Sequence, residues 1–295
     1  MTEAMKRILV LAFFLVTTFA LAEPAPFPGV GAVTIPIGSG FETSGAYFNP
    51  YNEDLWIVDD GGQVKLIHGL VTVDTWNLGG DLEGIVVPNP EDEPNIIMVI
   101  KERTPEQIRE YDMSTNPAQA KRTFDLTPWY GGYDNDGPEA IAIEKHTCYE
   151  PSCENCHLYS VFIAGQLDNF IRWGSIDVED CDPTYEFDLP YTIYPCYEGL
   201  CENSDYISDM VVTNSSWGEP MLWVLYGDHA NVIRILNTDG DWYADYYGTD
   251  SRNEALGVDF YGCKVWIGSD FGANGDLKRY IFPTTYMGCQ FLNQD

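Results

Sequence analysis

The chain has 295 residues and carries 46 Asp and Glu against 15 Lys and Arg, a net charge of -31. This charge repels the phosphates of nucleic acids and anionic lipid surfaces, so it disfavours both as partners and suits divalent cations, cationic partners or a saline medium. A surface kept soluble by charge explains most of the same excess, and charge alone therefore identifies no function.

The N-terminus has the pattern of a secretory signal peptide. Lys6 and Arg7 precede an apolar run over residues 8–20 that ends at the small-residue triplet Ala20-Leu21-Ala22, which predicts cleavage before Glu23. The run is too short for the roughly 20 residues that span a bilayer. We therefore expect residues 1–22 to be removed and residues 23–295 to form one secreted or extracellular domain, periplasmic in a bacterium, without a membrane span and monomeric.

A repeat follows in chain order. Five segments begin with a small or acidic residue and continue with apolar positions: SGAYF from Ser44, EGIVV from Glu83, EAIAI from Glu139, SDMVV from Ser208 and LGVDF from Leu256. A second apolar run follows each of them and ends at a polar residue: Asp60 (or its neighbour Asp59), Glu102, Gln166, Asp228 and Asp270. In each repeat a third apolar run follows and contains a basic residue. A fourth run is visible in four of the five repeats, so each repeat is interpreted as four strands.

Four antiparallel strands repeated around a ring are the blades of a β-propeller. The sequence thus predicts an all-β, five-bladed β-propeller. The spare segment GAVTIPI from Gly31 is expected to complete the last blade, because a ring must hide its sheet edges. A six-bladed ring is the alternative, if the N-terminal and C-terminal strands form a further sheet.

Eight cysteines in an exported chain are expected to pair. Six crowd the third repeat and its exit, which predicts a cysteine-rich insertion stapled to its own blade: Cys148, Cys153, Cys156, Cys181, Cys196 and Cys201. Cys263 is expected to bridge Cys289, and Cys196 to bridge Cys201. The alternative for Cys153-x-x-Cys156, with His146 and His157 nearby, is a zinc site.

The segments DLEGIVV, PEAIAI, YISDMVV and LWIVDDGGQVKLI resemble the repeats of the SdiA-regulated (YjiK-like) family of five-bladed propellers, which are related to NHL-repeat proteins. The resemblance covers about residues 41–282. It implies a calcium ion held near the central axis, with no established catalytic activity. Its pattern of Ser or Glu at the start of each innermost strand is matched at Ser44, Glu83, Glu139 and Ser208. Leu256 breaks it, so either Glu254 substitutes through a shifted register or the site has lost one oxygen.

Two rings of polar residues should converge at the channel mouth, because innermost strands begin where second strands end. The inner ring contains Ser44, Glu83, Glu139, Ser208 and Glu254, and the outer ring contains Asp60, Glu102, Gln166, Asp228 and Asp270. Crowded carboxylates repel unless a cation lies among them, and an oxygen-lined cage is what calcium prefers. The alternative is that these acids cap turns and stay solvated.

Two functions fit the sequence, of which the first is favoured and the second is the alternative. One is a calcium-binding interaction module for an extracellular protein or glycan, and Asn214-Ser215-Ser216 is a glycosylation sequon if the source is eukaryotic. The other is a calcium-dependent hydrolase of lactonase, esterase or phytase type, for which His229 beside Asp228 is the candidate base. The sequence contains no serine-hydrolase elbow and no phosphate-binding loop of the P-loop type.

Overall fold

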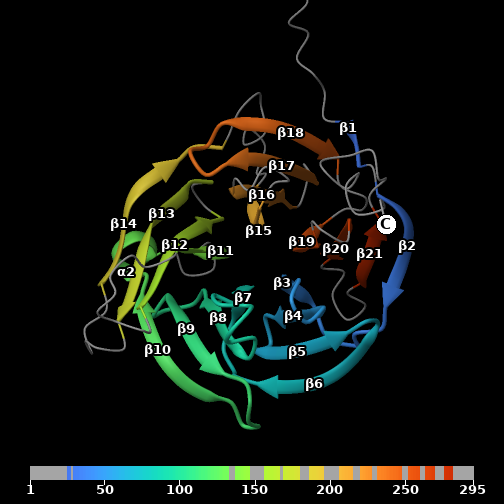
Figure 1. Cartoon of the computed structure of the whole chain (residues 1–295), viewed down its shortest axis with the longest axis horizontal. Helices are drawn as coiled ribbons and strands as arrows, with labels where there is room; N and C mark the ends of the chain where they lie inside the picture. Colours follow the sequence, from blue (N-terminus) through green and yellow to red (C-terminus); the bar gives the residue numbers. More distant parts are fainter. Residues whose placement is uncertain are drawn as a thin grey trace, which may run out of the picture.

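The computed structural model describes residues 25–27, 29–132, 137–146, 156–166, 169–179, 186–195, 206–214, 220–227, 231–247, 252–259, 263–269 and 276–281. Within these ranges the chain forms strands apart from one helical turn, α2 (Thr127–Tyr130). The strands make five antiparallel sheets arranged around a central axis, as Figure 1 shows. The predicted five-bladed β-propeller is therefore confirmed, and the six-bladed alternative is wrong.

Each blade is one sheet whose innermost strand lines the channel. Blade 1 contains β3 (Thr43–Asn49), β4 (Asp54–Asp59), β5 (Gln63–His68) and β6 (Val71–Asn77). Blade 2 contains β7 (Leu82–Val86), β8 (Ile96–Lys101), β9 (Gln107–Asp112) and β10 (Gln119–Asp125). Blade 3 contains β11 (Pro138–His146), β12 (Cys156–Gly165), β13 (Ile171–Glu179) and β14 (Glu186–Ile193).

The last two blades include the N-terminal strands. Blade 4 contains β15 (Ile207–Asn214), β16 (Pro220–Tyr226), β17 (Val232–Asn237) and β18 (Trp242–Tyr247), with β1 (Ala25–Pro26) added parallel to β18. Blade 5 contains β19 (Asn253–Asp259), β20 (Lys264–Ser269), β21 (Asp276–Ile281) and β2 (Val30–Ile35). Because β2 pairs antiparallel with β21, the expected closure of the ring by the N-terminal segment is confirmed.

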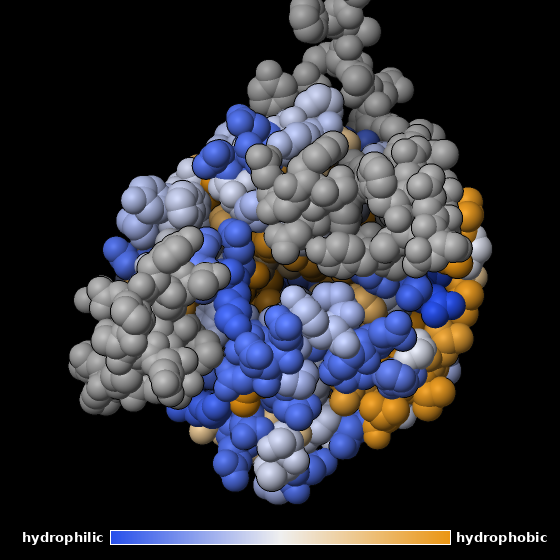
Figure 2. Space-filling view, viewed as in Figure 1, coloured by the Kyte–Doolittle hydropathy of each residue, from blue (hydrophilic) through white to orange (hydrophobic). Residues whose placement is uncertain are grey.

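Burial along the strands follows their distance from the axis. Strand β8 is buried on both faces until its last residue, as expected for a strand covered by a blade on either side. Strand β6, at the outer edge of blade 1, is exposed at most positions and buries Trp76. Val71 and Val73 in β6 and Val30 in β2 are exposed at the outer edges of blades 1 and 5. Figure 2 shows hydrophobic residues along the right-hand rim of the molecule, the side on which Figure 1 places β2.

The hydrophobic core is divided into five clusters, one between each pair of neighbouring blades. Between blades 5 and 1, for example, Phe48 stacks on Trp266 with ring centroids 4.4 Å apart. Large flat side chains fill the wedge between two sheets well, which explains the aromatic content of the chain. Each blade is therefore held in place by its packing against its two neighbours.

Several sequence-based predictions concern residues that are not described. The signal peptide over residues 1–22 lies outside the described residues, as do the expected disulfide partners Cys196, Cys201 and Cys289. Cys263 is described and buried at the entry to β20. Asn214 is the last residue of β15, and the rest of its sequon is not described. No helix in the described part of the chain is both long and apolar enough to cross a membrane.

Candidate metal centre at the acidic channel mouth

Every innermost strand starts with a β-bulge, and the bulge positions the predicted inner ring. The pairing with the second strand shifts between Thr43 and Gly45 in β3, and equivalent shifts occur near the start of β7, β11, β15 and β19. The residues at these shifts are Ser44, Glu83, Glu139, Ser208 and Glu254. A bulge re-aims a side chain out of the ladder, so one polar residue per blade is directed to the same mouth.

The structure resolves the ambiguity at the fifth blade. Glu254 lies within the shift between Asn253 and Ala255, whereas Leu256 pairs with Ile267 and is fully buried in the core between blades 4 and 5. The assignment of Leu256 to the repeat position was therefore wrong, because short-segment matching cannot count the extra residue of a bulge. Glu254 is the fifth member of the ring.

These residues line one cavity of about 140 Å³. Its walls contain the whole inner ring, three members of the outer ring and one aromatic residue that the sequence analysis did not select: Ser44, Asp60, Glu83, Glu102, Glu139, Gln166, Tyr206, Ser208 and Glu254. Asp60, Glu102 and Gln166 each directly follow the second strand of a blade. Asp228 and Asp270 lie outside the described residues, so the structure leaves their placement open.

Burial and mutual repulsion disfavour the charged forms of two glutamates from neighbouring blades, Glu83 in β7 and Glu139 in β11. Burial raises the pKa of Glu83 well above its ordinary value, and the charges of Glu139 and Asp60 raise it further. Burial likewise raises the pKa of Glu139, with added repulsion from Glu102 and Glu254. In the absence of a cation, both groups therefore favour the neutral form.

Glu102 is positioned by the neighbouring blade. Its carboxylate accepts a hydrogen bond of 3.0 Å from the backbone N–H of Gly137, at the entry to blade 3. Burial raises the pKa of Glu102 to about 7, although this bond works in the opposite direction. A hydrogen bond between the carboxyl groups of Glu102 and Glu139 opposes the rise in the pKa of Glu102 and adds to the rise in the pKa of Glu139. The two groups therefore titrate as a coupled pair.

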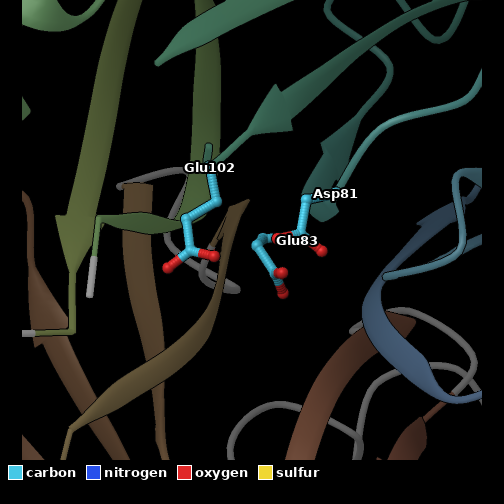
Figure 3. A group of neighbouring side chains, drawn as sticks. All are labelled: Asp81, Glu83 and Glu102. Atoms are coloured by element: carbon cyan, nitrogen blue, oxygen red, sulfur yellow. The ribbon is translucent and has the colours of Figure 1, made fainter. Parts of the chain in front are cut away.

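A further carboxylate, Asp81, was not predicted from the sequence and completes the densest part of the site. Oxygens of Asp81, Glu83 and Glu102 lie within 4.8 Å of one another, and Figure 3 shows the three side chains converging. Asp81 directly precedes β7 and forms an ion pair with the exposed Arg103. The sequence feature that could have revealed Asp81 is the segment Asp81-x-Glu83, because residues two apart in extended backbone lie on the same side of the strand.

The serines of the ring already bond to neighbouring groups. Ser208 donates from Oγ to the backbone carbonyl of Asn253, 3.0 Å away in the next blade. Ser44 donates to Asp60, which orients that carboxylate at the mouth. Each hydroxyl oxygen keeps lone pairs that could accept a cation.

Below the ring, the residue after each bulge must pass close to the next blade. A Cβ atom on Gly45 would lie 2.1 Å from the carbonyl oxygen of Glu83, and one on Gly84 would lie 2.7 Å from the backbone nitrogen of Ile141. Small residues are therefore required here, and Ala140 and Ala255 hold the corresponding places in blades 3 and 5. The residue of blade 4 is the exception.

That exception is Asp209, a fully buried carboxylate at the centre of the ring. One of its oxygens, Oδ2, accepts hydrogen bonds from the backbone N–H groups of Ala46 in blade 1, at 3.1 Å, and Leu256 in blade 5, at 2.7 Å. The other accepts from Met210, at 2.8 Å. Burial raises the pKa of Asp209 well above its ordinary value, and these three bonds oppose that rise. In the sequence, Asp209 is recognisable only as part of the strand segment SDMVV.

No family model and no curated protein matches the sequence. Among solved structures, the chain is similar to a luciferin-regenerating enzyme, with a TM-score of 0.45 and 11% identity over 85% of this chain and 95% of that one. This similarity is too weak to carry an argument about the site. The resemblance to the SdiA-regulated family therefore stays a hypothesis.

Proposed function

We propose that the acidic channel mouth binds a calcium ion. The observation that carries the proposal is the convergence of Asp81, Glu83 and Glu102, whose oxygens approach one another within 4.8 Å. Glu139 lines one cavity together with Glu83 and Glu102, and its charge raises the pKa of Glu83. Placing four carboxylates together destabilises the folded protein unless protons or a cation neutralise them, and a divalent cation does so at neutral pH.

The donor types favour calcium over softer metals. The described residues around the cavity offer carboxylate, amide, hydroxyl and phenol oxygens, and they include no His or Cys. Oxygen-only ligation suits calcium or magnesium, whereas zinc and copper favour nitrogen and sulfur. Ligands drawn from separate blades with different side-chain lengths fit the flexible, high-coordination shell of calcium better than the strict octahedron of magnesium.

The test is calcium titration by calorimetry, together with thermal unfolding in calcium and in excess chelator. We expect saturable binding, a higher midpoint with calcium, and loss of both effects in Glu83→Gln and Glu139→Gln. At calcium concentrations about 100 times Kd, linkage predicts roughly 2.7 kcal/mol of stabilisation. The matched control is Glu144→Gln, which changes a half-buried glutamate at the other end of β11. A midpoint that ignores the chelator contradicts the proposal.

We further propose that the mature protein is an exported, disulfide-bonded interaction module that presents this calcium site to an extracellular protein or glycan. The signal-peptide pattern and the eight cysteines support export and disulfide bonding. A net charge of -31 favours a partner with a cationic surface.

One observation favours a second function, calcium-dependent hydrolysis. Glu102 lines the cavity, and burial raises its pKa to about 7 when no cation is bound. It would act as a general base only if Asp81, Glu83 and Glu139 held the ion and Glu102 lay outside the calcium shell. A calcium ion beside it would polarise an ester, lactone or phosphate oxygen. A panel of such substrates, assayed with calcium and with chelator, separates the two functions. Turnover that disappears in Glu102→Gln supports the hydrolase, and no turnover supports the interaction module.

A further inference from the structure

A second, larger cavity lies at the opposite end of the innermost strands. Its volume is about 270 Å³, and all five blades contribute to its walls. Its lining includes two tyrosines and three charged residues: Tyr47, Tyr51, Glu91, Glu144 and Lys145. Tyr47 and Glu144 lie in β3 and β11, the strands that contribute Ser44 and Glu139 to the acidic mouth.

The two cavities are separate. In β15, Ser208 lines the acidic mouth and Val211 lines the second cavity, with the buried Asp209 and Met210 between them. Asp209 accepts hydrogen bonds from the backbone N–H groups of Ala46 and Leu256, and these bonds connect blades 4, 1 and 5 at this level. A ligand in the second cavity therefore does not touch the proposed calcium site.

The walls of the second cavity combine polar and apolar surface in similar amounts, and two tyrosines lie among the lining residues. Tyr47 is half-buried, and burial together with the nearby Tyr51 raises the pKa of its hydroxyl group. Tyr51 itself is 61% exposed at the rim of the cavity. Valines of three blades, Val87, Val212 and Val258, complete the apolar surface. An aromatic face beside apolar walls favours a flat apolar group, and it attracts a cation attached to that group.

The charges at this cavity are unbalanced toward negative. Burial raises the pKa of the half-buried Glu144, and His146 opposes that rise. The amino group of Lys145 donates to Asn89 at 2.6 Å and to Asp92 at 2.9 Å, so its charge is neutralised by Asp92. Glu144 and the exposed Glu91 are then left to face a ligand.

We propose that this cavity binds a small organic cation: an ammonium or guanidinium group on an apolar body of about one aromatic ring. The size follows from the volume, which is slightly below the roughly 300–1,000 Å³ of pockets for drug-sized ligands. The charge follows from Glu144 and Glu91, and the aromatic preference from Tyr47 and Tyr51. An anion would meet two carboxylates and a lysine that is already paired.

The test compares three probes of one shape. Benzylammonium, benzyl alcohol and benzoate are titrated by NMR into the mature protein at about 0.15 M salt, where long-range attraction is screened, with calcium present in excess. We expect saturable binding of benzylammonium only. We expect Glu144→Gln and Tyr51→Ala each to weaken it by about three- to tenfold, the range of one charge or cation–π contact.

Two control variants locate the site. Asp74→Asn removes an exposed charge from the outer strand β6, and Glu139→Gln removes one from the acidic mouth; both should leave benzylammonium binding unchanged. Equal binding of the three probes would overturn the proposal, as would equal weakening by Asp74→Asn and Glu144→Gln, because the attraction would then be diffuse. Weakening by Glu139→Gln alone would also overturn it. Calcium binding is measured separately, so its failure leaves this result interpretable.

Discussion

Replacing Asp209 with alanine tests whether a buried carboxylate holds the ring together at its centre. The substitution removes the acceptor for two inter-blade hydrogen bonds, from Ala46 and Leu256, and for the local bond from Met210. Ala46 and Leu256 are both fully buried, so water does not replace the lost acceptor without local opening. Each buried donor left without a partner costs about 1–3 kcal/mol.

The charge of Asp209 reduces this loss. Burial raises the pKa of the carboxyl group, which means that ionised Asp209 is itself destabilising relative to the unfolded chain. Alanine relieves that cost while it orphans the donors, and we expect a net loss of about 2–4 kcal/mol in the free energy of unfolding. Urea denaturation at pH 7 with constant calcium measures it.

Asparagine is the matched control for this experiment. Its side-chain oxygen can take the place of Oδ2 and accept both inter-blade bonds, while its amide nitrogen faces the N–H of Met210. We expect Asp209→Asn to lose less than half as much stability as Asp209→Ala. Amide hydrogen exchange at Ala46 and Leu256 should accelerate in the alanine variant only. Equal stability of the alanine variant and the wild type would refute the reasoning.

Three further predictions concern the site and the seam. In chelator, the free energy of unfolding should fall as pH rises from about 4.5 toward 7, because the raised pKa values of Glu83 and Glu139 keep protons bound in the folded state that the unfolded state releases. Thermal unfolding across this pH range measures the fall, and added calcium should abolish it. Reducing the expected bridge between Cys263 and Cys289 should cost roughly 3 kcal/mol, and peptide mapping without reductant should recover the linked pair or exclude it. Gly45→Ala should cost about 1–3 kcal/mol in denaturation, because its Cβ would meet the carbonyl of Glu83 at 2.1 Å.

The sequence was sufficient for the fold because the blade is a local unit. Strand-length apolar runs recur in every repeat, and a Ser or Glu at the start of the innermost strand is visible in four of the five, so five blades followed from counting. The same regularity placed Ser44, Glu83, Glu139 and Ser208 at one cavity. Their role as metal ligands stays a prediction.

The features that the sequence did not reveal depend on contacts between blades. Glu254 was ambiguous because a bulge adds a residue that pattern matching does not count. Asp209 occupies the place that small residues take in the other blades, and its partners Ala46 and Leu256 are far away in the chain. The second cavity arises where five strand ends meet, and no single repeat carries its signal.

The pairing of β2 with β21 also determines when the protein can finish folding. Val30 pairs with Ile281, so the last blade needs residues from both ends of the chain, roughly 250 positions apart. Until the C-terminal strands have been synthesised and are free to pair, β2 has no partner and blade 1 lacks a neighbour on one side. A second molecule can supply the missing strand during that interval, and refolding at high concentration should therefore yield strand-swapped dimers.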